Sequence, residues 1–163
     1  MEVVLIKLEL TVMSEEHAKE VCNWKYEDEY SVYNLSDWET VVQNNWELAI
    51  KEEREANFLS VTQKDQLVAY GVITMKNDSV LIGIGLKPSL CGKGLGKEIM
   101  RLLIEEGKAR FPDAPMALEV RTFNKRAIKC YESIGFEIRE KYRRDTPTVE
   151  KAEFYYMVHS DAE

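Results

Sequence analysis

Histidine and cysteine are scarce in this chain: its 163 residues include two histidines and three cysteines, Cys22, Cys91 and Cys130. The cysteines are odd in number and widely spaced, which argues against a disulfide framework. So few histidines and cysteines also argue against a zinc site built from them. We therefore expect no metal cofactor and a reducing cytoplasm as the protein's location.

Long apolar runs are also missing. No stretch approaches the roughly 18 apolar residues that a membrane-spanning helix needs, so we expect no membrane partner. The N-terminal segment MEVVLIKLEL carries Glu2 and has neither a basic start nor a small-residue cleavage site. We expect no signal peptide.

Charge is distributed unevenly along the chain. Residues 1–60 carry 5 basic and 14 acidic side chains, a net charge of −9, whereas residues 61–163 carry 17 and 15, a net charge of +2. The acidic part would repel nucleic acid and attract cations, and the later part could hold a small anionic cofactor. Solubility alone is the other explanation of the acidity. No basic aromatic platform is present, so we expect no nucleic-acid partner.

Hydrophobic periodicity predicts alternating strands and helices. Ser14 is a candidate N-cap for the helix that follows the first strand. The expected order is β-α-α-β-β-β-α-β-α-β-β, a mixed α/β sheet with helices on both sides and no long linker. The expected strands are 3–12, 57–62, 67–75, 80–86, 116–122, 136–144 and 151–159, and the expected helices are 14–24, 36–53, 95–111 and 124–135.

The segment CGKGLGKEIM, residues 91–100, places three glycines and two lysines at the start of a helix. It is not a Walker A loop, because Gly92 and Gly96 are one residue too close and Glu98 follows Lys97. It is not a dinucleotide fingerprint either, because Ile99 stands where the third glycine belongs. Free N–H groups at a helix start and exposed glycine backbone suit a pyrophosphate. The alternative is a tight strand-to-helix turn without a ligand.

The preceding strand VLIGIGL favours the ligand. Gly83 and Gly85 share one face of this strand. Paired glycines weaken a strand and make sense where another group lies close to the backbone. A pyrophosphate on the loop with a thin tail along this bare face has the shape of coenzyme A.

With these features the chain resembles the GNAT superfamily of N-acetyltransferases. Its cofactor motif, [QR]-x-x-G-x-[GA], is matched by Gly94 and Gly96, with Cys91 in the first position. The segment LEVRTFNKRAIKCYESIGF, residues 118–136, is similar to the ribosomal-protein alanine N-acetyltransferase branch. The resemblance covers residues 57–158 and implies an α/β (α+β) fold with a single mixed, mostly antiparallel sheet of about six to seven strands. Residues 1–163 would form one domain, with acceptor-side helices in 1–56 and an acetyl-CoA-binding core in 57–158.

The resemblance also implies the cofactor-binding residues. Backbone on the glycine strand would pair with the pantetheine arm and polarise the thioester, and the glycine loop would take the pyrophosphate. Asn124 would contact pantetheine, unless it only caps a helix. Cys91 removes one phosphate donor, which predicts weaker cofactor binding. The implied set is Ile84, Gly85, Leu86, Gly92, Lys93, Gly94, Leu95, Gly96, Lys97 and Asn124.

Direct acyl transfer needs a neutral amine, a stabilised oxyanion and a proton for the departing thiolate. Glu119 matches the glutamate of LEVR and is the candidate general base, directly or through water. Its alternative role is a surface carboxylate paired with Arg121 or a neighbour. Tyr131 is the candidate acid for the thiolate, and its alternative role is core packing. Backbone N–H near Leu86 would stabilise the oxyanion.

The acceptor is least defined. Segment 24–38 combines tryptophans and tyrosines with Glu27, Asp28 and Glu29, which suits a cationic amine or, alternatively, simple ring packing beside a solvated acidic loop. The function expected is an acetyl-CoA-dependent N-acetyltransferase acting on a primary amine of a small molecule or a peptide N-terminus. The alternative is a non-catalytic acyl-CoA-binding sensor or interaction module. A homodimer is a further hypothesis, with the tyrosine-rich segment EFYYMV as its edge.

Overall fold

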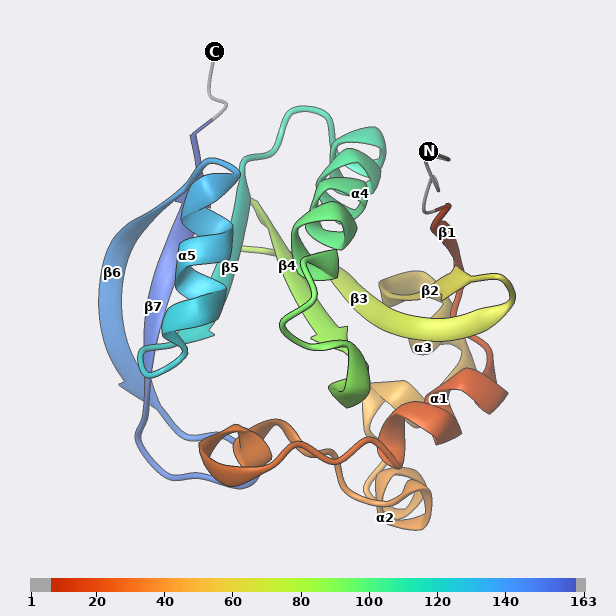
Figure 1. Cartoon of the computed structure of the whole chain (residues 1–163). Coiled ribbons are helices and arrows are strands. Elements are labelled where there is room, and N and C mark those ends of the chain that lie inside the picture. Colours follow the sequence, from red (N-terminus) through yellow and green to blue (C-terminus); the bar gives the residue numbers. More distant parts are fainter. Residues whose placement is uncertain (1–6, 161–163) are drawn as a thin grey trace. The chain divides into compact units, whose positions relative to one another are not determined.

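The computed structural model describes residues 7–160 and contains one seven-stranded sheet with the strand order β1-β2-β3-β4-β5-β7-β6 (Figure 1). β4 and β5 run parallel, whereas β1–β2, β2–β3, β5–β7 and β6–β7 are antiparallel. The mixed, mostly antiparallel α/β fold is thus confirmed. The strands are β1 Glu9–Val12, β2 Phe58–Gln63, β3 Gln66–Lys76, β4 Ser79–Leu86, β5 Met116–Arg121, β6 Phe136–Arg144 and β7 Ala152–His159.

The helices follow the expected pattern with one exception. They are α1 Glu15–Cys22, α2 Trp38–Gln43, α3 Lys51–Asn57, α4 Leu95–Arg110 and α5 Lys125–Ser133, with 3₁₀ helices η1 Asp28–Tyr33, η2 Glu47–Ala49 and η3 Pro88–Leu90. The predicted N-cap is confirmed, because the Ser14 hydroxyl accepts a hydrogen bond from His17 N–H. Residues 3–6 of the predicted first strand lie outside the described residues. No helix in the described part has the length and apolar character needed to span a bilayer.

The continuous helix expected over 36–53 is wrong. α2 ends at Gln43 in a Schellman motif: Asn45 has φ 54°, and the N–H groups of Asn45 and Trp46 donate to Val42 and Val41. Asparagine tolerates this left-handed conformation, so it ends the helix where the apolar spacing alone predicts continuation. The 3₁₀ helix η2 and the helix α3 take the place of the second half of the predicted helix.

The homodimer edge expected at EFYYMV is also wrong. These residues belong to β7, which pairs with β5 on one side and β6 on the other. β6 is the edge strand instead, and its exposed residues are mostly charged. Charged side chains on an edge strand oppose pairing with another chain.

The chain forms two compact units. Unit 1 comprises the chain up to Val72 together with Ile84–Lys93, and unit 2 comprises Ile73–Gly83 together with the chain from Gly94 onward. In unit 1, buried side chains of α1, α2 and η2 pack around Trp24 and β3. They are Ala18, Val21, Cys22, Val41 and Leu48, and they are joined by Met13, which precedes α1, and by Leu67 of β3.

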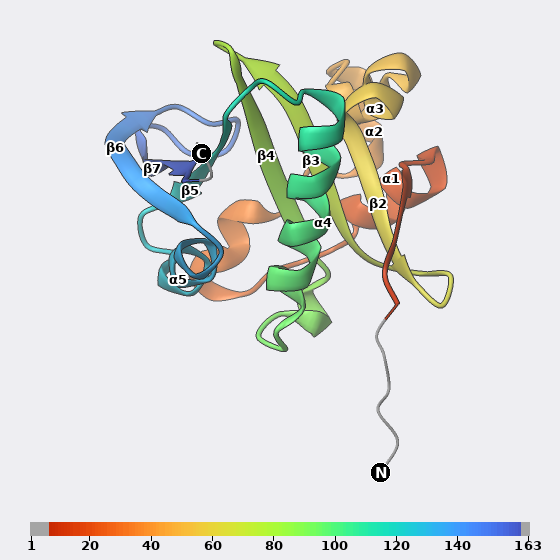
Figure 2. The same cartoon turned by 90° about the horizontal axis from the view of Figure 1, so that it is seen from above.

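In unit 2, α4 and α5 lie on the same face of the strands of that unit (Figures 1 and 2). α4 buries a stripe at helical spacing, formed by Leu95, Ile99, Met100, Leu103, Ile104 and Gly107. Leu118 and Val120 of β5 are buried, whereas Glu119 and Arg121 point to the other face and are half-buried. The fold therefore places the two polar side chains of LEVR on the same side of the sheet.

In unit 1, the ring of Tyr70 fills the space over Gly85. A Cβ added at Gly85 would lie 2.1 Å from Tyr70 Cε1, and Tyr70 in turn contacts the Trp24 ring at a centroid distance of 6.1 Å. At Gly85 the bare strand face is thus occupied by this ring, not open for the cofactor tail that we expected there. A glycine is required here because a neighbouring aromatic side chain approaches the backbone.

We expect Gly85→Ala to lower the free energy of unfolding by about 1–3 kcal/mol, because the added methyl group overpacks against Tyr70. Urea denaturation measures the change. Gly96→Ala is the matched control: no heavy atom lies within 4 Å of its added Cβ. This helical position should gain up to about 1 kcal/mol. A Gly85→Ala protein as stable as the wild type would contradict the packing of Tyr70 on Gly85.

Candidate active site

Two hydrogen bonds hold the peptide group between Leu86 and Lys87 at the end of β4. The Tyr26 hydroxyl donates to the Leu86 carbonyl at 2.6 Å, and Lys87 N–H donates to the Val68 carbonyl at 2.9 Å. Leu86 is the residue whose N–H we expect to stabilise the oxyanion. The two hydrogen bonds fix the backbone immediately after that N–H, and preorganised backbone donors are the main source of such stabilisation.

Tyr26 belongs to a cluster of tyrosines in unit 1. Its ring meets Tyr33 edge-on at a centroid distance of 6.4 Å, and Tyr30 stacks on Tyr33 at 6.4 Å. Burial, with the nearby Tyr70 and Cys91, raises the pKa of Tyr26 above its ordinary value. The hydroxyl therefore stays protonated and continues to donate to Leu86 at physiological pH. Sequence reasoning missed this contact, since 60 residues separate the two partners.

The glycine loop leaves its backbone accessible. Gly92 and Gly94 have φ values of 79° and 80°, which favour glycine, and Gly94 is the N-cap of α4. A Cβ placed on Gly94 or Gly96 would meet no heavy atom within 4 Å. The start of a sixteen-residue helix thus has open space at its two glycines. This geometry fits a phosphate group.

Cys91 turns back toward β4. Its Sγ lies 3.9 Å from the Leu86 carbonyl oxygen and 3.7 Å from that of Lys87. The thiol thus contacts the strand end that Tyr26 also holds. The weaker cofactor binding that we expect from a cysteine at position 91 stays a prediction.

Glu119 is held by two residues of β6. Arg144 donates from Nε to Oε2 and from Nη2 to Oε1, both at 3.1 Å, and the Tyr142 hydroxyl donates to Oε2. The glutamate side chain is only 16% exposed. The alternative role paired this carboxylate with Arg121 or a neighbour, and the structure gives Tyr142 and Arg144 as its partners.

These contacts determine the charge of Glu119. Partial burial works to raise its pKa, but hydrogen bonds from Arg144 and Tyr142 and the positive charges of Arg144 and Lys76 outweigh burial and hold the pKa below its usual value. Burial and the bond to Glu119 raise the pKa of Tyr142. The pair is therefore an ionised carboxylate and a neutral tyrosine.

Arg121 has a different environment. Its guanidinium lies over the rings of Phe123 and Phe154, at 5.3 and 5.5 Å from their centroids. Its Nε is buried and has no hydrogen-bond partner among the described residues. Arg121 therefore packs against aromatic rings and does not neutralise Glu119.

Asn124 and Tyr131 are both on or beside α5. The Asn124 side-chain oxygen accepts a hydrogen bond from Ala127 N–H at 3.3 Å, so it caps α5 as the alternative interpretation expected. Tyr131 is half-buried, and its ring meets Phe136 edge-on at 6.3 Å. The pantetheine contact of Asn124 and the acid role of Tyr131 stay predictions.

The predicted residues are divided between the units. Unit 1 holds the end of β4, Ile84–Leu86, with Gly92 and Lys93. Unit 2 holds Gly94–Lys97 at the start of α4, together with Glu119, Asn124 and Tyr131. Within unit 2, β4 pairs with β5 through Val80 opposite Met116 and Leu81 opposite Ala117.

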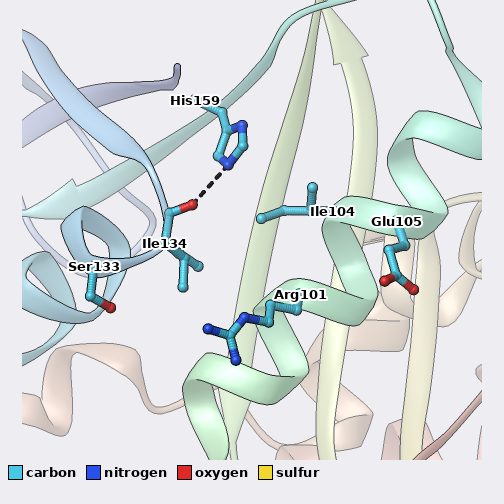
Figure 3. Close-up of a pocket in the computed structure, with 6 residues that line it drawn as sticks. All are labelled: Arg101, Ile104, Glu105, Ser133, Ile134 and His159. Atoms are coloured by element: carbon cyan, nitrogen blue, oxygen red, sulfur yellow. Dashed lines mark hydrogen bonds between the residues drawn. The ribbon is translucent and has the colours of Figure 1, made fainter. Parts of the chain in front are cut away.

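Unit 2 also contains a groove between α4 and the end of α5 (Figure 3). It encloses about 380 Å³ and is lined by Arg101, Ile104, Glu105, Ser133, Ile134 and His159. Arg101 also bonds to Glu98 at 2.6 Å, and His159 Nε2 lies 2.8 Å from the Ile134 carbonyl oxygen. None of the lining residues belongs to the predicted site. Among the described residues, no group of three or more histidine, cysteine or acidic side chains could hold a metal ion.

We expect Glu119→Gln to destabilise the protein at neutral pH and progressively less in acid. A carboxylate with a lowered folded-state pKa adds stability that is complete above its unfolded pKa, about 4.3, and is lost as the pH falls through the folded value. Urea denaturation of both proteins from about pH 7 to about pH 3 measures the difference across that pKa. Glu98→Gln is the control, because Glu98 pairs with Arg101 on the surface. A pH-independent difference for Glu119→Gln would contradict the Arg144 pairing.

Comparison with known proteins agrees with the fold. The model of the acetyltransferase (GNAT) family matches residues 18–136. The [ribosomal protein bS18]-alanine N-acetyltransferase of Escherichia coli strain K12 is 33% identical over 102 residues, covering 62% of this chain and 68% of that protein.

Solved structures show the same fold. A spermidine N-acetyltransferase SpeG chimera from Vibrio cholerae and hSSAT superposes with a TM-score of 0.74 at 16% identity, covering 93% of this chain and 94% of the other. The putative acetyltransferase yncA of Salmonella typhimurium, solved with its cofactor acetyl-CoA, gives a TM-score of 0.69 at 17% identity, covering 96% and 95%. With the family model spanning most of its length, this chain belongs to the acetyltransferase (GNAT) family and is an acetyl-CoA-dependent N-acetyltransferase.

Proposed function

We propose that this enzyme transfers the acetyl group directly to the α-amino group of a peptide or protein chain. The observation that carries the proposal is the pairing of Glu119 with Arg144 and Tyr142, which makes Glu119 an ionised but weak base. A weak base suits an acceptor whose amine is easily deprotonated. The Escherichia coli relative, named for the alanine of a ribosomal protein, is consistent with such an acceptor.

The cost of deprotonating the acceptor separates the two amine classes. A lysine-like amine has a pKa near 10.4, so its neutral form costs roughly 4–5 kcal/mol at pH 7. An α-amine with a pKa of about 7.7–8.0 costs only about 1–1.4 kcal/mol. Because Arg144 already stabilises the charge of Glu119, this carboxylate gains little from taking a proton from a strongly basic amine.

We assign cofactor binding to two neighbouring segments of the chain. The backbone of Ile84–Leu86 pairs with the pantetheine arm, and the loop Gly92–Lys97 binds the pyrophosphate. Two observations support this assignment: Tyr26 bonds to the strand end, and a Cβ added at Gly94 or Gly96 would meet no heavy atom within 4 Å. Lys93 and Lys97 supply positive charge to the phosphates.

The reaction follows from these roles. The amine nitrogen attacks the thioester carbon, forming a C–N bond, and Leu86 N–H stabilises the oxyanion. The C–S bond breaks, and the Tyr131 hydroxyl supplies the proton that the thiolate takes up. The acceptor's surplus proton passes to Glu119, directly or through one water. Bound orientation of both substrates supplies much of the remaining rate.

A polyamine is the second candidate acceptor, and unit 1 provides the observation in its favour. The tyrosine cluster of Tyr26, Tyr30 and Tyr33 adjoins three acidic residues at the start of η1, Glu27, Asp28 and Glu29. Aromatic faces with carboxylates attract cations. The SpeG chimera of the same fold is a spermidine N-acetyltransferase.

Several expectations from the sequence stay predictions. These are the single-domain organisation over 1–163, the cytoplasmic location and the homodimer. For a dimer that pairs β-strands at this end of the sheet, the edge would be β6.

The decisive assay measures coenzyme A thiol release from acetyl-CoA with short peptides bearing free N-termini, acetylated peptides containing lysine, and polyamines. We expect release with free N-termini. Tyr131→Phe should lower kcat about a hundredfold, the typical contribution of one acid–base group. Tyr155→Phe on β7 is the control for loss of a tyrosine hydroxyl. Release with polyamines alone would replace the peptide acceptor with the second candidate, and wild-type activity in Tyr131→Phe would exclude Tyr131 as the acid.

Tyr26→Phe tests the fixed strand end. Removing the hydroxyl leaves the Leu86 carbonyl without its tyrosine donor, and the net value of one hydrogen bond is about 0.5–1.5 kcal/mol. We expect acetyl-CoA affinity to fall by about twofold to tenfold in isothermal titration calorimetry. Tyr30→Phe, from the same aromatic cluster, is the control. Equal affinity and kcat in Tyr26→Phe and wild type would contradict a role for this hydrogen bond in ordering the cofactor strand.

A further inference from the structure

Arg144 forms a bidentate pair with Glu119. Its Nε and Nη2 bond to the two different carboxylate oxygens, each at 3.1 Å. A planar guanidinium that meets a planar carboxylate in this way fixes the plane of the carboxylate as well as its charge. Glu119 therefore has one orientation in the folded protein.

Aromatic packing holds Arg144 in place. Its guanidinium carbon lies 4.3 Å from the centroid of the Phe154 ring. Tyr142, directly opposite Phe154 in the register of β6 and β7, stacks on the same ring at 6.1 Å and 24°. Phe154 thus supports both residues that bond to Glu119, and it is itself buried.

The bonds are divided unequally between the carboxylate oxygens. Oε2 accepts from Arg144 Nε and from Tyr142, whereas Oε1 accepts only from Arg144 Nη2 among the described residues. A carboxylate oxygen can accept two hydrogen bonds. Oε1 is therefore the atom with a lone pair available for an incoming proton.

The charged and titratable neighbours of Glu119 come from several strands. β6 supplies Tyr142 and Arg144, β3 supplies Lys76, and β7 places Tyr156 opposite Glu119. Arg121 of β5 is occupied by the rings of Phe123 and Phe154. Arg144 is consequently the arginine whose hydrogen bonds oppose the effect of burial on Glu119. Without it, burial would favour the protonated form.

We propose that Arg144 is the positioning residue of the acetyl transfer, holding Glu119 deprotonated with Oε1 directed to receive the acceptor's proton. The inference rests on the role given to Glu119 under the proposed function. Arg144 itself exchanges no proton: as the acceptor nitrogen bonds to the thioester carbon, its proton passes to Glu119, directly or through water. The guanidinium only fixes where that proton is received.

The test is the pH dependence of kcat/KM with a peptide acceptor for wild type, Arg144→Gln and Arg144→Lys. In Arg144→Gln we expect kcat/KM to fall about tenfold to a hundredfold, as for a misplaced reacting group, and the acid limb of the profile to move to higher pH. Arg144→Lys keeps the positive charge but loses the bidentate hydrogen bonds, so its acid limb should lie between those of the wild type and Arg144→Gln. The KM for acetyl-CoA should not change.

Arg143→Gln is the matched control, because Arg143 is the neighbouring arginine and pairs with Glu153. We expect its profile to match the wild type. Millimolar guanidinium ion, with sodium chloride at equal ionic strength as control, should restore part of the activity of Arg144→Gln. A merely structural role of Arg144 would not give this rescue.

Two outcomes would overturn the proposal: an acid limb unchanged in both Arg144 variants, or an equal shift in Arg143→Gln. If Arg144→Gln does not fold, the profile of Arg144→Lys decides the matter alone. A wild-type protein that acetylates no amine would instead contradict the proposed acceptor and leave the positioning role without its basis. An active wild type with unshifted variants would contradict Arg144 only.

Discussion

The hydrogen bond from Tyr26 to the Leu86 carbonyl is the contact on which the position of the end of β4 depends. The adjacent Lys87 N–H bonds to Val68, and the Tyr70 ring closes over Gly85. Together they give the end of β4 one conformation before any substrate binds. Oxyanion stabilisation depends on donors that need no reorganisation during the reaction. A tyrosine from the acidic N-terminal part of the chain thereby orders backbone assigned to cofactor binding.

A second constraint sets the chemistry of Glu119. Burial alone would raise its pKa and make it a stronger base, but Arg144, Tyr142 and Lys76 shift the balance toward the charged form. The result is a carboxylate that is ready to accept a proton yet has little affinity for it. Such a group is better suited to an α-amine, whose deprotonation costs about 1 kcal/mol, than to a lysine-like amine, whose deprotonation costs about 4 kcal/mol. Under the proposed function, acceptor choice is thereby tied to the pairing of β6 with β7.

The sequence predicted what local signals encode. The cap at Ser14, the glycine loop before α4 and the spacing of the strands all depend on residues close in the chain, and the structure agrees. The contacts of Glu119 could not be predicted in this way. Arg144 lies 25 residues further on in β6, and the pairing of β6 with β7 has a register shift between Ile138 and Glu140 that local signals do not encode. The break at Asn45 was readable in principle, since asparagine is common where a helix ends in a left-handed residue.

The most direct test of the central claim is a backbone amide NMR titration of the ¹⁵N-labelled protein with acetyl-CoA. We expect the largest chemical-shift changes at Ile84–Leu86 and across the loop Gly92–Lys97, and we expect these changes to be weaker in Tyr26→Phe. Binding that leaves the amides of β4 unchanged and shifts those lining the groove at Arg101 and Ile134 would contradict it.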